Sequence, residues 1–381
     1  MKILYLSSVR IPTEKAAGLA IVRQCQAFVE IGHTVELLVP IRSHKDCSTV
    51  EVMYGFKPDF TIKKIRSLAL FFLGKPGFYF MLVCESVKMF FYYLIKGKHD
   101  LIYSRDQFLL LAFVLGGATD KIVLELHTKQ TDFVTRFVAK RVKKIIVISG
   151  GLKEYYEREL GRNDITIEPS GVNLEQFTNL PDAFSIKKKL LLPLDKIIFG
   201  YVGKYKTMGE DKGVGDIIRA FARAYKKNNN IYLLLVGIED SEKNEVLATA
   251  QDCELPSLAF LVLALDQKRF AEYVIASDVL LMNYPNSEHY AWYMSPTKLF
   301  AYLAVGHPII SSDLPSIRSV VDDEDVLFVK PGNVQSYAEA MIYAASNLSD
   351  MNRGRSKRMQ LASKFNWKSR ATRILDFVVR H

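Results

Sequence analysis

The sequence predicts an α/β protein built from two doubly wound parallel-sheet domains. The chain has 381 residues, of which 49% are hydrophobic and 24% charged, and this is enough for two domains that each bury a full core. Residues 1–40 read as strand, loop, helix and strand, which is the building block of such a sheet. The same pattern restarts at residue 197, after a stretch at 178–186 that reads as a linker.

The strands of the first half are short apolar runs that end in polar residues. They are expected at residues 1–9, 34–40, 101–104, 122–127, 145–148 and 165–169, with helices at 19–31 and 152–160. Open α/β sheets bind ligands outside the carboxyl ends of their strands, so the chemistry is expected there. The loop at 10–18 lacks the G-x-G-x-x-G fingerprint, which argues against a nicotinamide enzyme.

Residues 62–95 differ from the rest of the chain, because they read as short apolar helices with basic and aromatic flanks. One interpretation is an ordinary core layer on one face of the sheet, since apolar stripes are usually buried. The other is a membrane-surface face, with Lys63, Lys64, Arg66 and Lys75 near anionic lipid headgroups. No run is expected to span a bilayer, which needs about 18 apolar residues.

The second half repeats the alternation. Strands are expected at 197–202, 231–237, 258–263 and 279–283, and helices at 216–226, 242–252 and 267–276. The tail at 365–381 reads as an amphipathic helix that can cross back onto the first half.

Charge and cysteine content suggest the environment of the protein. The net charge is +10, and residues 1–180 carry +7 of it, so an acidic partner such as lipid or phosphate is expected mainly for the first half. Cys25, Cys47, Cys84 and Cys253 have no metal-ligand or redox-motif spacing, which favours free thiols in a reducing, cytoplasmic compartment. No signal peptide is apparent at the amino terminus.

A basic, glycine-rich loop at 203–213 follows one strand of the second half and opens a helix. Glycine lets the backbone approach a pyrophosphate, and Lys204, Lys206 and Lys212 could neutralise its charge. A solvated basic loop has the same composition. The spacing is not that of a Walker A motif.

The stretch at 293–308 reads as a polar loop that becomes a helix. Ser295 is expected as the N-cap and Pro296 as the first helical residue, while Gly306 and Pro308 end the helix. A helix start presents unpaired N–H groups and the positive end of a dipole, which suits a phosphate. An ordinary surface helix is the alternative.

Other catalytic signatures are few. His127 ends a strand beside Glu125; a lone histidine is more often structural, but the carboxyl end of a strand favours a functional role. The sequence shows no nucleophile elbow, Cys/His metal cluster or nucleic-acid module, so neither a metal nor nucleic acid is expected.

A series of short stretches carries a family resemblance by its order and spacing. They are Gly32-His33-Thr34-Val35, Tyr103-Ser104-Arg105-Asp106, Glu125-Leu126-His127, Val147-Ile148-Ser149, Pro169-Ser170-Gly171-Val172-Asn173, Tyr201-Val202-Gly203-Lys204, Asp211-Lys212-Gly213-Val214, Leu235-Val236-Gly237, Ala276-Ser277-Asp278-Val279 and Ser295-Pro296-Thr297-Lys298-Leu299-Phe300. Over nearly its full length the chain resembles the family 4 retaining glycosyltransferases of GT-B fold, in the subgroup with a Ser-Pro-x-Lys-Leu-Phe motif. The resemblance implies two Rossmann-like domains facing a cleft, an acceptor domain at 1–178 and a donor domain at 179–365, with a helix at about 366–381 that packs back on the first.

The resemblance also implies roles for particular residues. Lys204 and Lys212 would hold the donor pyrophosphate, with Lys206 able to share the role, and His127 would contact the transferred sugar. The other implied donor-binding residues are Gly18, Gly203, Val236, Gly237, Leu263, Leu265, Tyr293, Ser295, Pro296, Thr297, Lys298, Leu299 and Ala301, and Arg105 and Asp106 lie on the acceptor side. No cofactor or metal is implied, because the nucleotide-sugar is a substrate.

Two positions depart from the family pattern, which has a pair of glutamates where this chain has Tyr293 and Ala301. The second glutamate normally binds the ribose hydroxyls, so Ala301 predicts weaker donor binding. Either the position has been substituted in an active enzyme, or the protein is a weak or inactive homologue.

The predicted function is therefore transfer of a sugar from a nucleotide-diphosphate sugar, with UDP the expected nucleotide, to a glycan or lipid-linked acceptor in surface polysaccharide or glycolipid synthesis. The expected location is the cytoplasm, with peripheral contact to the inner face of the membrane. The alternatives are a non-catalytic nucleotide-sugar or glycan-binding paralogue and a nucleotide-sugar epimerase of the same fold.

Overall fold

The computed structural model describes residues 1–13, 15–41, 49–68, 70–207 and 210–380. The chain divides into two compact units. The first comprises Met1–Gly171, Tyr293–Ser295 and Trp367–His381, and the second comprises Val172–Trp292 and Pro296–Asn366. The division therefore falls at Gly171, seven residues before the boundary at 178 expected from the sequence, and the C-terminal helix belongs to the first unit.

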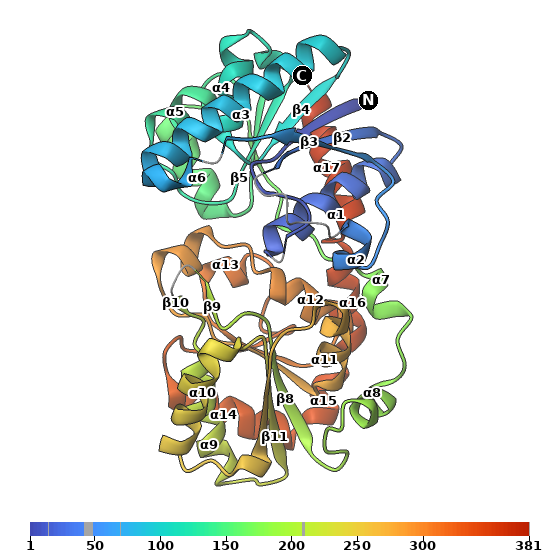
Figure 1. Cartoon of the computed structure of the whole chain (residues 1–381). Helices are drawn as coiled ribbons and strands as arrows, with labels where there is room; N and C mark the ends of the chain where they lie inside the picture. Colours follow the sequence, from blue (N-terminus) through green and yellow to red (C-terminus); the bar gives the residue numbers. More distant parts are fainter. Residues whose placement is uncertain (14, 42–48, 69, 208–209, 381) are drawn as a thin grey trace. The chain divides into compact units, whose positions relative to one another are not determined.

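The first unit is a seven-stranded parallel sheet between two helical layers (Figure 1). Its elements are β1 (Lys2–Leu6), α1 (Ala16–Glu30), β2 (Thr34–Ile41), α2 (Val50–Tyr54), β3 (Thr61–Arg66), η1 (Phe71–Leu73), α3 (Gly74–Lys96), β4 (Leu101–Ser104), α4 (Gln107–Leu115), η2 (Thr119–Lys121), β5 (Ile122–Leu126), α5 (Phe133–Ala139), β6 (Lys144–Val147), α6 (Gly150–Leu160), β7 (Ile165–Ile167) and α17 (Trp367–Val379). The strand order is β3-β2-β1-β4-β5-β6-β7. The order reverses beside β1, and at such a switch point the loops at the carboxyl ends of neighbouring strands diverge and leave room for a ligand.

Each face of this sheet has its own apolar core. On one face α1 packs beside α17, burying Cys25, Phe28 and Ile374 (Figure 1). On the other face α3, α4, α5 and α6 cover a second cluster that includes Leu110 and Leu152. The central strands read as continuous apolar runs because both of their faces are buried.

The second unit has the same architecture around a six-stranded parallel sheet of order β12-β11-β8-β13-β14-β15. Its elements are α7 (Glu175–Thr178), α8 (Ala183–Lys189), β8 (Ile197–Val202), β9 (Lys206–Thr207), β10 (Glu210–Asp211), α9 (Val214–Tyr225), β11 (Ile231–Val236), α10 (Asp240–Asp252), η3 (Ser257–Ala259), β12 (Phe260–Leu263), η4 (Gln267–Arg269), α11 (Phe270–Ala276), β13 (Val279–Met282), η5 (His289–Tyr293), α12 (Thr297–Val305), β14 (Ile309–Ser312), α13 (Pro315–Arg318), β15 (Leu327–Val329), α14 (Val334–Ser346), α15 (Leu348–Asn352) and α16 (Arg355–Ser363). The stretch expected as a linker at 178–186 contains the start of helix α8.

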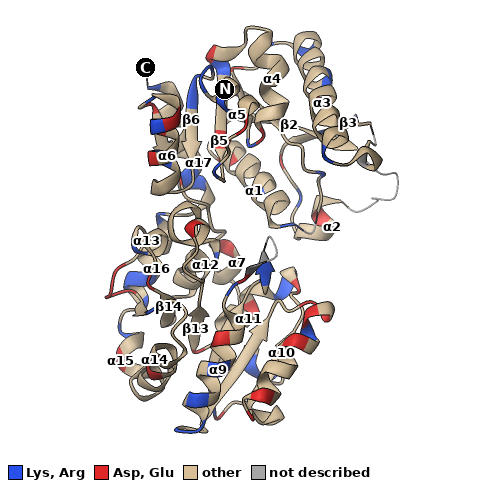
Figure 2. Cartoon of the chain, turned by 90° about the vertical axis from the view of Figure 1, so that its left-hand side faces the viewer, with Lys and Arg blue, Asp and Glu red and all other residues tan. Residues whose placement is uncertain are grey.

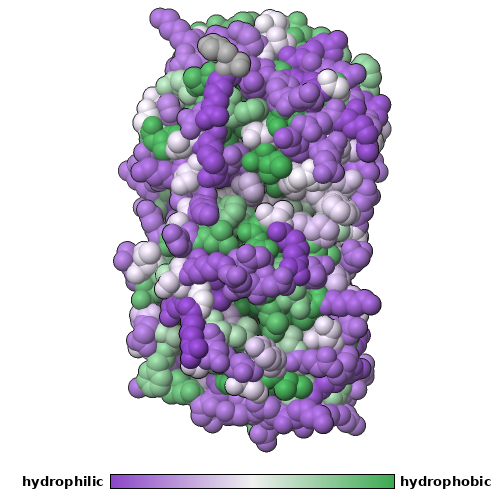
Figure 3. Space-filling view, turned by 180° about the vertical axis from the view of Figure 1, so that it is seen from behind, coloured by the Kyte–Doolittle hydropathy of each residue, from purple (hydrophilic) through white to green (hydrophobic). Residues whose placement is uncertain are grey.

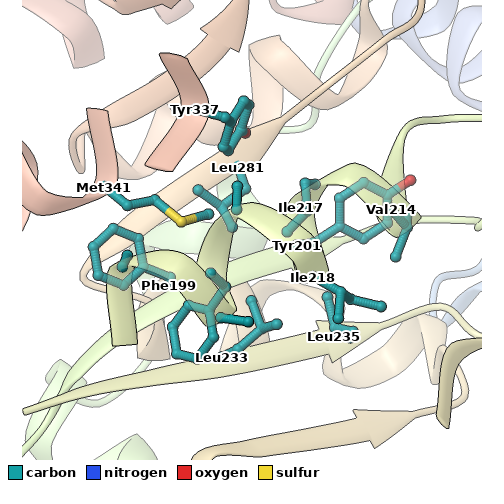
Figure 4. Packing of buried hydrophobic residues seen from close by; sticks show 14 of the residues in the cluster. Phe199, Tyr201, Val214, Ile217, Ile218, Leu233, Leu235, Leu281, Tyr337 and Met341 are labelled. Carbon is teal, nitrogen blue, oxygen red and sulfur yellow. The ribbon is translucent and has the colours of Figure 1, made fainter. Parts of the chain in front are cut away.

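The core of the second unit shows why its sequence folds as it does. Apolar residues of α9 recur at helical spacing, and Val214, Ile217 and Phe221 are fully buried against the sheet. Strand residues such as Phe199 and Leu281 belong to the same cluster. Tyr337 and Met341 of α14 complete it (Figure 4). Burying each side chain of this size contributes about 1.5–3 kcal/mol.

The segment at 62–95 differs from its prediction in two ways. Residues 74–96 form one continuous helix, α3, instead of short helices. The Gly-Lys-Pro-Gly stretch that suggested a break lies in its first turn. Proline is tolerated there because the backbone N–H groups of the first turn have no partner within the helix. The basic residues before it form an edge strand, β3, with Lys63, Lys64 and Arg66 exposed. Such charges protect an edge from pairing with another chain.

Charges are unevenly placed on the surface. Figure 2 shows α3 largely free of charged residues, whereas α9, α10 and α17 carry many. The face seen from behind is mostly hydrophilic, with scattered hydrophobic residues (Figure 3), as is normal for a folded protein. Cys25, Cys84 and Cys253 are free thiols, and Cys47 lies outside the described residues.

Candidate active site

In the second unit, two glycines allow close contact at the carboxyl ends of β8 and β11. The Gly203 N–H donates to the carbonyl of Val236 at 2.8 Å. A Cβ on Gly237 would lie 2.2 Å from the Gly203 carbonyl oxygen, and a Cβ on Gly203 would lie 2.7 Å from Cε of Lys298. Both glycines have positive φ, at +148° and +107°, so other residues would be strained as well as crowded. This packing places Lys298 directly beside the glycine-rich loop.

Three lysines of this unit gather at that point. Burial and the neighbouring Lys212 hold the pKa of Lys298 well below its ordinary value. Burial and the neighbouring Lys204 lower the pKa of Lys212 to about 8. Among the described residues no carboxylate pairs with any of the three amino groups. Like charges without a counter-ion repel one another, so the cluster is arranged for an anion.

Lys206 has a different environment from the other lysines of the loop. Its Nζ lies 2.5 Å from Oε2 of Glu245 on the surface, and Glu245 also accepts a hydrogen bond from Tyr205 at 2.7 Å. Lys206 is thus engaged by an acidic residue, which leaves Lys204 as the unpaired lysine at this end of the loop. Met208 and Gly209, which belong to the same predicted loop, lie outside the described residues.

The predicted helix start at residue 295 is only partly correct. Helix α12 begins at Thr297, and its N-cap is Pro296, which has no side-chain donor or acceptor. The prediction that Ser295 is the N-cap is wrong, because its hydroxyl accepts a hydrogen bond from the Ser170 N–H at 2.9 Å. The first N–H groups of α12 therefore have no side-chain cap in the described part of the chain, and an anion could satisfy them. Gly306 ends the helix with φ of +74°, as predicted.

Contacts beyond the predicted set hold this region together. The Tyr302 hydroxyl accepts from the Val202 N–H at 3.0 Å and so joins α12 to the end of β8. Asn283 donates to the carbonyl of Gly213 at 3.0 Å and accepts from the Ser312 hydroxyl at 3.2 Å, which fixes the turn after Lys212. The sequence signal for Asn283 was its position as a polar residue at the end of a predicted strand.

The remaining donor-side predictions fall on strand ends or on α12. Gly237 donates to the carbonyl of Leu263 at 2.8 Å, so Val236, Gly237 and Leu263 lie together at the ends of β11 and β12. Leu265 follows two residues beyond β12 and is half-buried. Ala301 is buried within α12.

In the first unit, His127 belongs to a buried ionic cluster around Glu125. Its Nε2 lies 2.5 Å from Oε1 of Glu125, and the same carboxylate pairs with Arg105 at 3.1 Å and with Arg370 at 2.8 Å. Burial alone would raise the pKa of Glu125, but the two arginines outweigh it and hold that pKa well below its ordinary value. Burial and Arg105 lower the pKa of His127, so its imidazole is neutral at neutral pH.

The other first-unit predictions have ordinary structural contacts. Gly18 lies within α1, not in the loop before it, and a Cβ there would meet Thr13 at 2.3 Å and Tyr54 at 2.7 Å. Asp106 caps α4 by accepting from the Phe108 N–H at 2.9 Å. Tyr293 packs in the first unit, with Nζ of Lys129 5.5 Å from its ring centroid.

The fold and a family model together indicate which class of protein this is. Residues 182–360 match the family model described as Glycosyl transferases group 1, and the whole chain has the GT-B fold. Residues 182–360 are thus a group 1 glycosyltransferase domain, and the resemblance to GT-B glycosyltransferases and the fold class predicted from the sequence are confirmed, while the subgroup with the Ser-Pro-x-Lys-Leu-Phe motif stays a prediction.

Individual relatives are distant in sequence. The alpha-monoglucosyldiacylglycerol synthase of Acholeplasma laidlawii is 23% identical over 266 residues, which are 62% of this chain and 63% of that protein. The chain therefore aligns with less than two thirds of this relative. Among solved structures, a Rickettsia africae glycosyltransferase superimposes with a TM-score of 0.77 at 14% identity, covering 99% of this chain and 97% of that one. Anabaena HepE, in complex with UDP and glucose, has a TM-score of 0.74 at 15% identity and covers both chains fully, at 100% each.

Proposed function

We propose that this glycosyltransferase moves a sugar from a nucleotide-diphosphate sugar to a glycan or lipid-linked acceptor, with UDP as the nucleotide. The observation that carries the proposal is the unpaired cluster of Lys204, Lys212 and Lys298 in the unit that also holds the uncapped start of α12. Lysine charge and helix-start amides are the groups that stabilise a diphosphate. The HepE structures with UDP and with UDP-glucose support this choice of donor.

The chemistry assigned to this site needs no protein nucleophile. As the bond between the sugar and the diphosphate breaks, negative charge grows on the departing oxygen. Lys204 and Lys212 stabilise that charge, which is the term expected to contribute most to the rate. The acceptor hydroxyl attacks on the face that the leaving group vacates, so the anomeric configuration is retained, and a diphosphate oxygen takes the proton of the hydroxyl. The lysines supply the positive charge that a metal ion would otherwise provide.

Ala301 limits the donor affinity in this proposal. It stands where the family resemblance places the ribose-binding glutamate, and it is 4% exposed. A charged hydrogen bond is worth about 1.5–3 kcal/mol, which corresponds to roughly tenfold to a hundredfold in affinity. A donor that binds weakly but measurably is therefore expected.

A thermal-shift screen across nucleoside diphosphate sugars, followed by transfer assays, tests the proposal. A donor that binds the folded state raises its apparent stability, and we expect UDP-sugars to give the largest shifts. Binding without transfer or hydrolysis would instead favour the non-catalytic paralogue. Conversion of the donor without an added acceptor would favour the epimerase. The absence of any shift with every nucleotide would contradict all three.

A second feature supports work at a membrane surface. Helix α3 is long and apolar enough to cross a membrane by length and composition, yet only 28% of its most apolar window is buried. One face packs against α4 through Ser86, whose hydroxyl donates to the Leu109 carbonyl at 2.8 Å and accepts from the Ala112 N–H at 2.9 Å. These buried polar contacts tie α3 to the domain, which favours a helix lying in the interface over one that spans it.

The opposite face of α3 is apolar and exposed. Its exposed apolar residues are Tyr79, Phe80, Val87, Phe91, Leu94 and Ile95, here called the α3 apolar face. Lys63, Lys64 and Arg66 of β3 and Lys75 of α3 are exposed basic residues of the same segment. Aromatic side chains together with lysine fit the interface of an anionic leaflet. We therefore assign a peripheral location at the cytoplasmic side of a membrane, which a lipid-linked acceptor would require. Retention of the protein by anionic vesicles at low salt tests this assignment.

A further inference from the structure

In the buried cluster of the first unit, two guanidinium groups, those of Arg105 and Arg370, pair with the carboxylate of Glu125, while the nearby carboxylate of Glu168 pairs with Arg373. Glu125 is fully buried; its two oxygens receive hydrogen bonds from His127, Arg370 and the Tyr103 hydroxyl, and Arg105 forms an ion pair with it at 3.1 Å. A lone buried ion is unfavourable, and one cation would suffice to compensate it. The second guanidinium therefore needs an explanation beyond charge balance.

Arg370 comes from α17, 245 residues after Glu125 along the chain. It is completely buried. Its Nε donates to the carbonyl of Pro169 at 2.7 Å, and its Nη2 donates to Glu125 Oε1 at 2.8 Å and to the carbonyl of Glu168 at 3.1 Å. Its Nη1 donates to Gln24 and, at 3.4 Å, to the other oxygen of Glu125. A planar fork held by this many acceptors has a single orientation, so it fixes the Glu125 carboxylate in turn.

The orientation of Glu125 decides which nitrogen of His127 carries the proton. An ionised carboxylate only accepts hydrogen bonds. The ring nitrogen that faces it, Nε2, must therefore be the donor, and in a neutral imidazole Nδ1 is then an acceptor. The side chain of His127 is 32% exposed, and in the described residues Nδ1 has no hydrogen-bond partner.

We propose that Arg370 is a positioning residue that, through Glu125, holds His127 as the Nε2–H tautomer and presents Nδ1 as an acceptor for a ligand hydroxyl. The proposal rests on the proposed function, together with the family resemblance, which implies that His127 contacts the transferred sugar. A carboxylate that orients a histidine from behind is a general device for fixing its tautomer. The ligand class that this arrangement recognises is a hydrogen-bond donor, not an anion.

The pH dependence follows from the charges that face His127, which are Glu125, Arg105 and Arg370. Protonation of His127 would convert Nδ1 from an acceptor into a donor and abolish the hydrogen bond to a sugar hydroxyl. The acid limb of kcat/KM should therefore lie below the ordinary histidine range. Removing the positive charge of Arg370 raises the pKa of His127, so the limb should move to higher pH.

The experiment compares R370Q with R373Q in the full-length protein. Arg373 lies on the same helix and pairs with a different carboxylate, Glu168, at 2.9 Å, so R373Q is the matched control. Nitrogen NMR of labelled histidine, with the signal of His127 assigned from an H127N spectrum, reports the tautomer directly. Steady-state kinetics from pH 5 to 9 with the donor found in the thermal-shift screen report the acid limb, kcat and KM.

We expect wild type and R373Q to show Nε2–H, and R370Q to show a mixture of tautomers. R370Q should lower kcat roughly tenfold to a hundredfold, as loss of an orienting contact does, and should shift the acid limb to higher pH. A wild-type Nδ1–H tautomer overturns the proposal, and so does an R370Q protein whose tautomer and pH limb equal those of R373Q.

A variant that retains the charge covers the case in which R370Q does not fold. R370K keeps a cation but only part of the fork, so we expect an intermediate effect on the tautomer and on kcat. If R370K matches R373K in both, the proposal is wrong. The NMR result does not depend on turnover. An Nε2–H tautomer that requires Arg370, in a protein that transfers no sugar, would support the positioning role while contradicting the proposed function.

Discussion

The amino group of Lys298 lies 3.3 Å from the centroid of the Tyr201 ring and has no carboxylate partner among the described residues. A cation over an aromatic face gains about 0.5–2 kcal/mol, which is less than a buried ammonium loses by leaving water. When Lys298 is protonated, its positive charge is therefore only partly compensated in the free protein, which agrees with its depressed pKa. An arriving diphosphate would supply the missing counter-charge, and this makes the lysine cluster the natural target for mutation.

Replacing Lys212 with glutamine should weaken UDP binding about tenfold to a hundredfold, because one charged hydrogen bond worth about 1.5–3 kcal/mol is lost. Isothermal titration calorimetry measures the change. K206Q is the matched control, since Lys206 lies in the same loop but pairs with Glu245. Equal losses in the two variants would show that general loop charge, and not the cluster, binds the nucleotide.

UDP binding should take up protons near pH 8. Burial and Lys204 lower the pKa of Lys212 to about 8, so about half of the amino groups are neutral there, and a diphosphate raises the pKa again by favouring the charged form. Affinity should fall as pH rises above 8. Calorimetry in two buffers of different ionisation enthalpy gives the number of protons, and K212Q should take up fewer. Proton uptake that is identical in K212Q would contradict this assignment.

The same pKa shift affects the stability of the free protein. A lysine whose folded-state pKa lies below its unfolded value, about 10.4, makes the unfolded chain bind more protons between pH 8 and 10.4. The Lys212 contribution to the free energy of unfolding therefore rises with pH between pH 8 and 10.4. Below pH 8, Lys212 does not change how the free energy of unfolding depends on pH. Denaturant unfolding of wild type and K212Q at pH 7.5 and 9.5 tests this, with a smaller pH effect expected in K212Q. A larger effect in K212Q would be inconsistent with a depressed Lys212 pKa.

The features that could be predicted from the sequence are those whose cause is local. Apolar strands alternating with helices predicted both sheets, and Lys204 and Lys212 lie between strand β8 and helix α9 as expected, while their role toward a pyrophosphate stays a prediction. Gly306 was recognised because a left-handed helix end requires glycine. The residues that produce these features lie within a few positions of one another, so the features can be recognised from a short stretch of sequence.

The features that were missed depend on distant partners. Ser295 looked like a helix cap, but its hydroxyl binds the Ser170 N–H, 125 residues away. The tail was predicted only as an amphipathic helix, with no role for Arg370, which is buried against Glu125. No spacing rule predicts such pairs, because the fold alone brings them together. The continuity of α3 was missed because a proline in a first turn and a proline that breaks a helix look alike in sequence.

Replacing Ala301 with glutamate should tighten UDP-sugar binding roughly tenfold to a hundredfold, by restoring the carboxylate that the family resemblance places on the ribose hydroxyls. Without a donor the variant should be less stable than wild type, because position 301 is 4% exposed and a buried carboxylate lacks compensation. Calorimetry and thermal unfolding with and without donor measure both effects. A301Q, which has the same length but no charge, is the control and should gain less affinity. Unchanged donor affinity in A301E would defeat the prediction.

Removing apolar side chains from the α3 apolar face should release the protein from membranes without unfolding it. Phe91 is 58% exposed and Ile95 is 80% exposed, so a double F91S/I95S change costs little packing in the folded protein. Each side chain buried in lipid contributes about 1.5–3 kcal/mol, and the double variant should lose more than tenfold of its binding to vesicles that contain anionic lipid. L258S is the control, because Leu258 is 85% exposed on the second unit.

Salt should weaken binding by wild type through Lys63, Lys64 and Arg66, since it screens exposed charges. If L258S and F91S/I95S sediment with vesicles equally, the α3 apolar face does not contact the membrane, and the acceptor must reach the enzyme by another route.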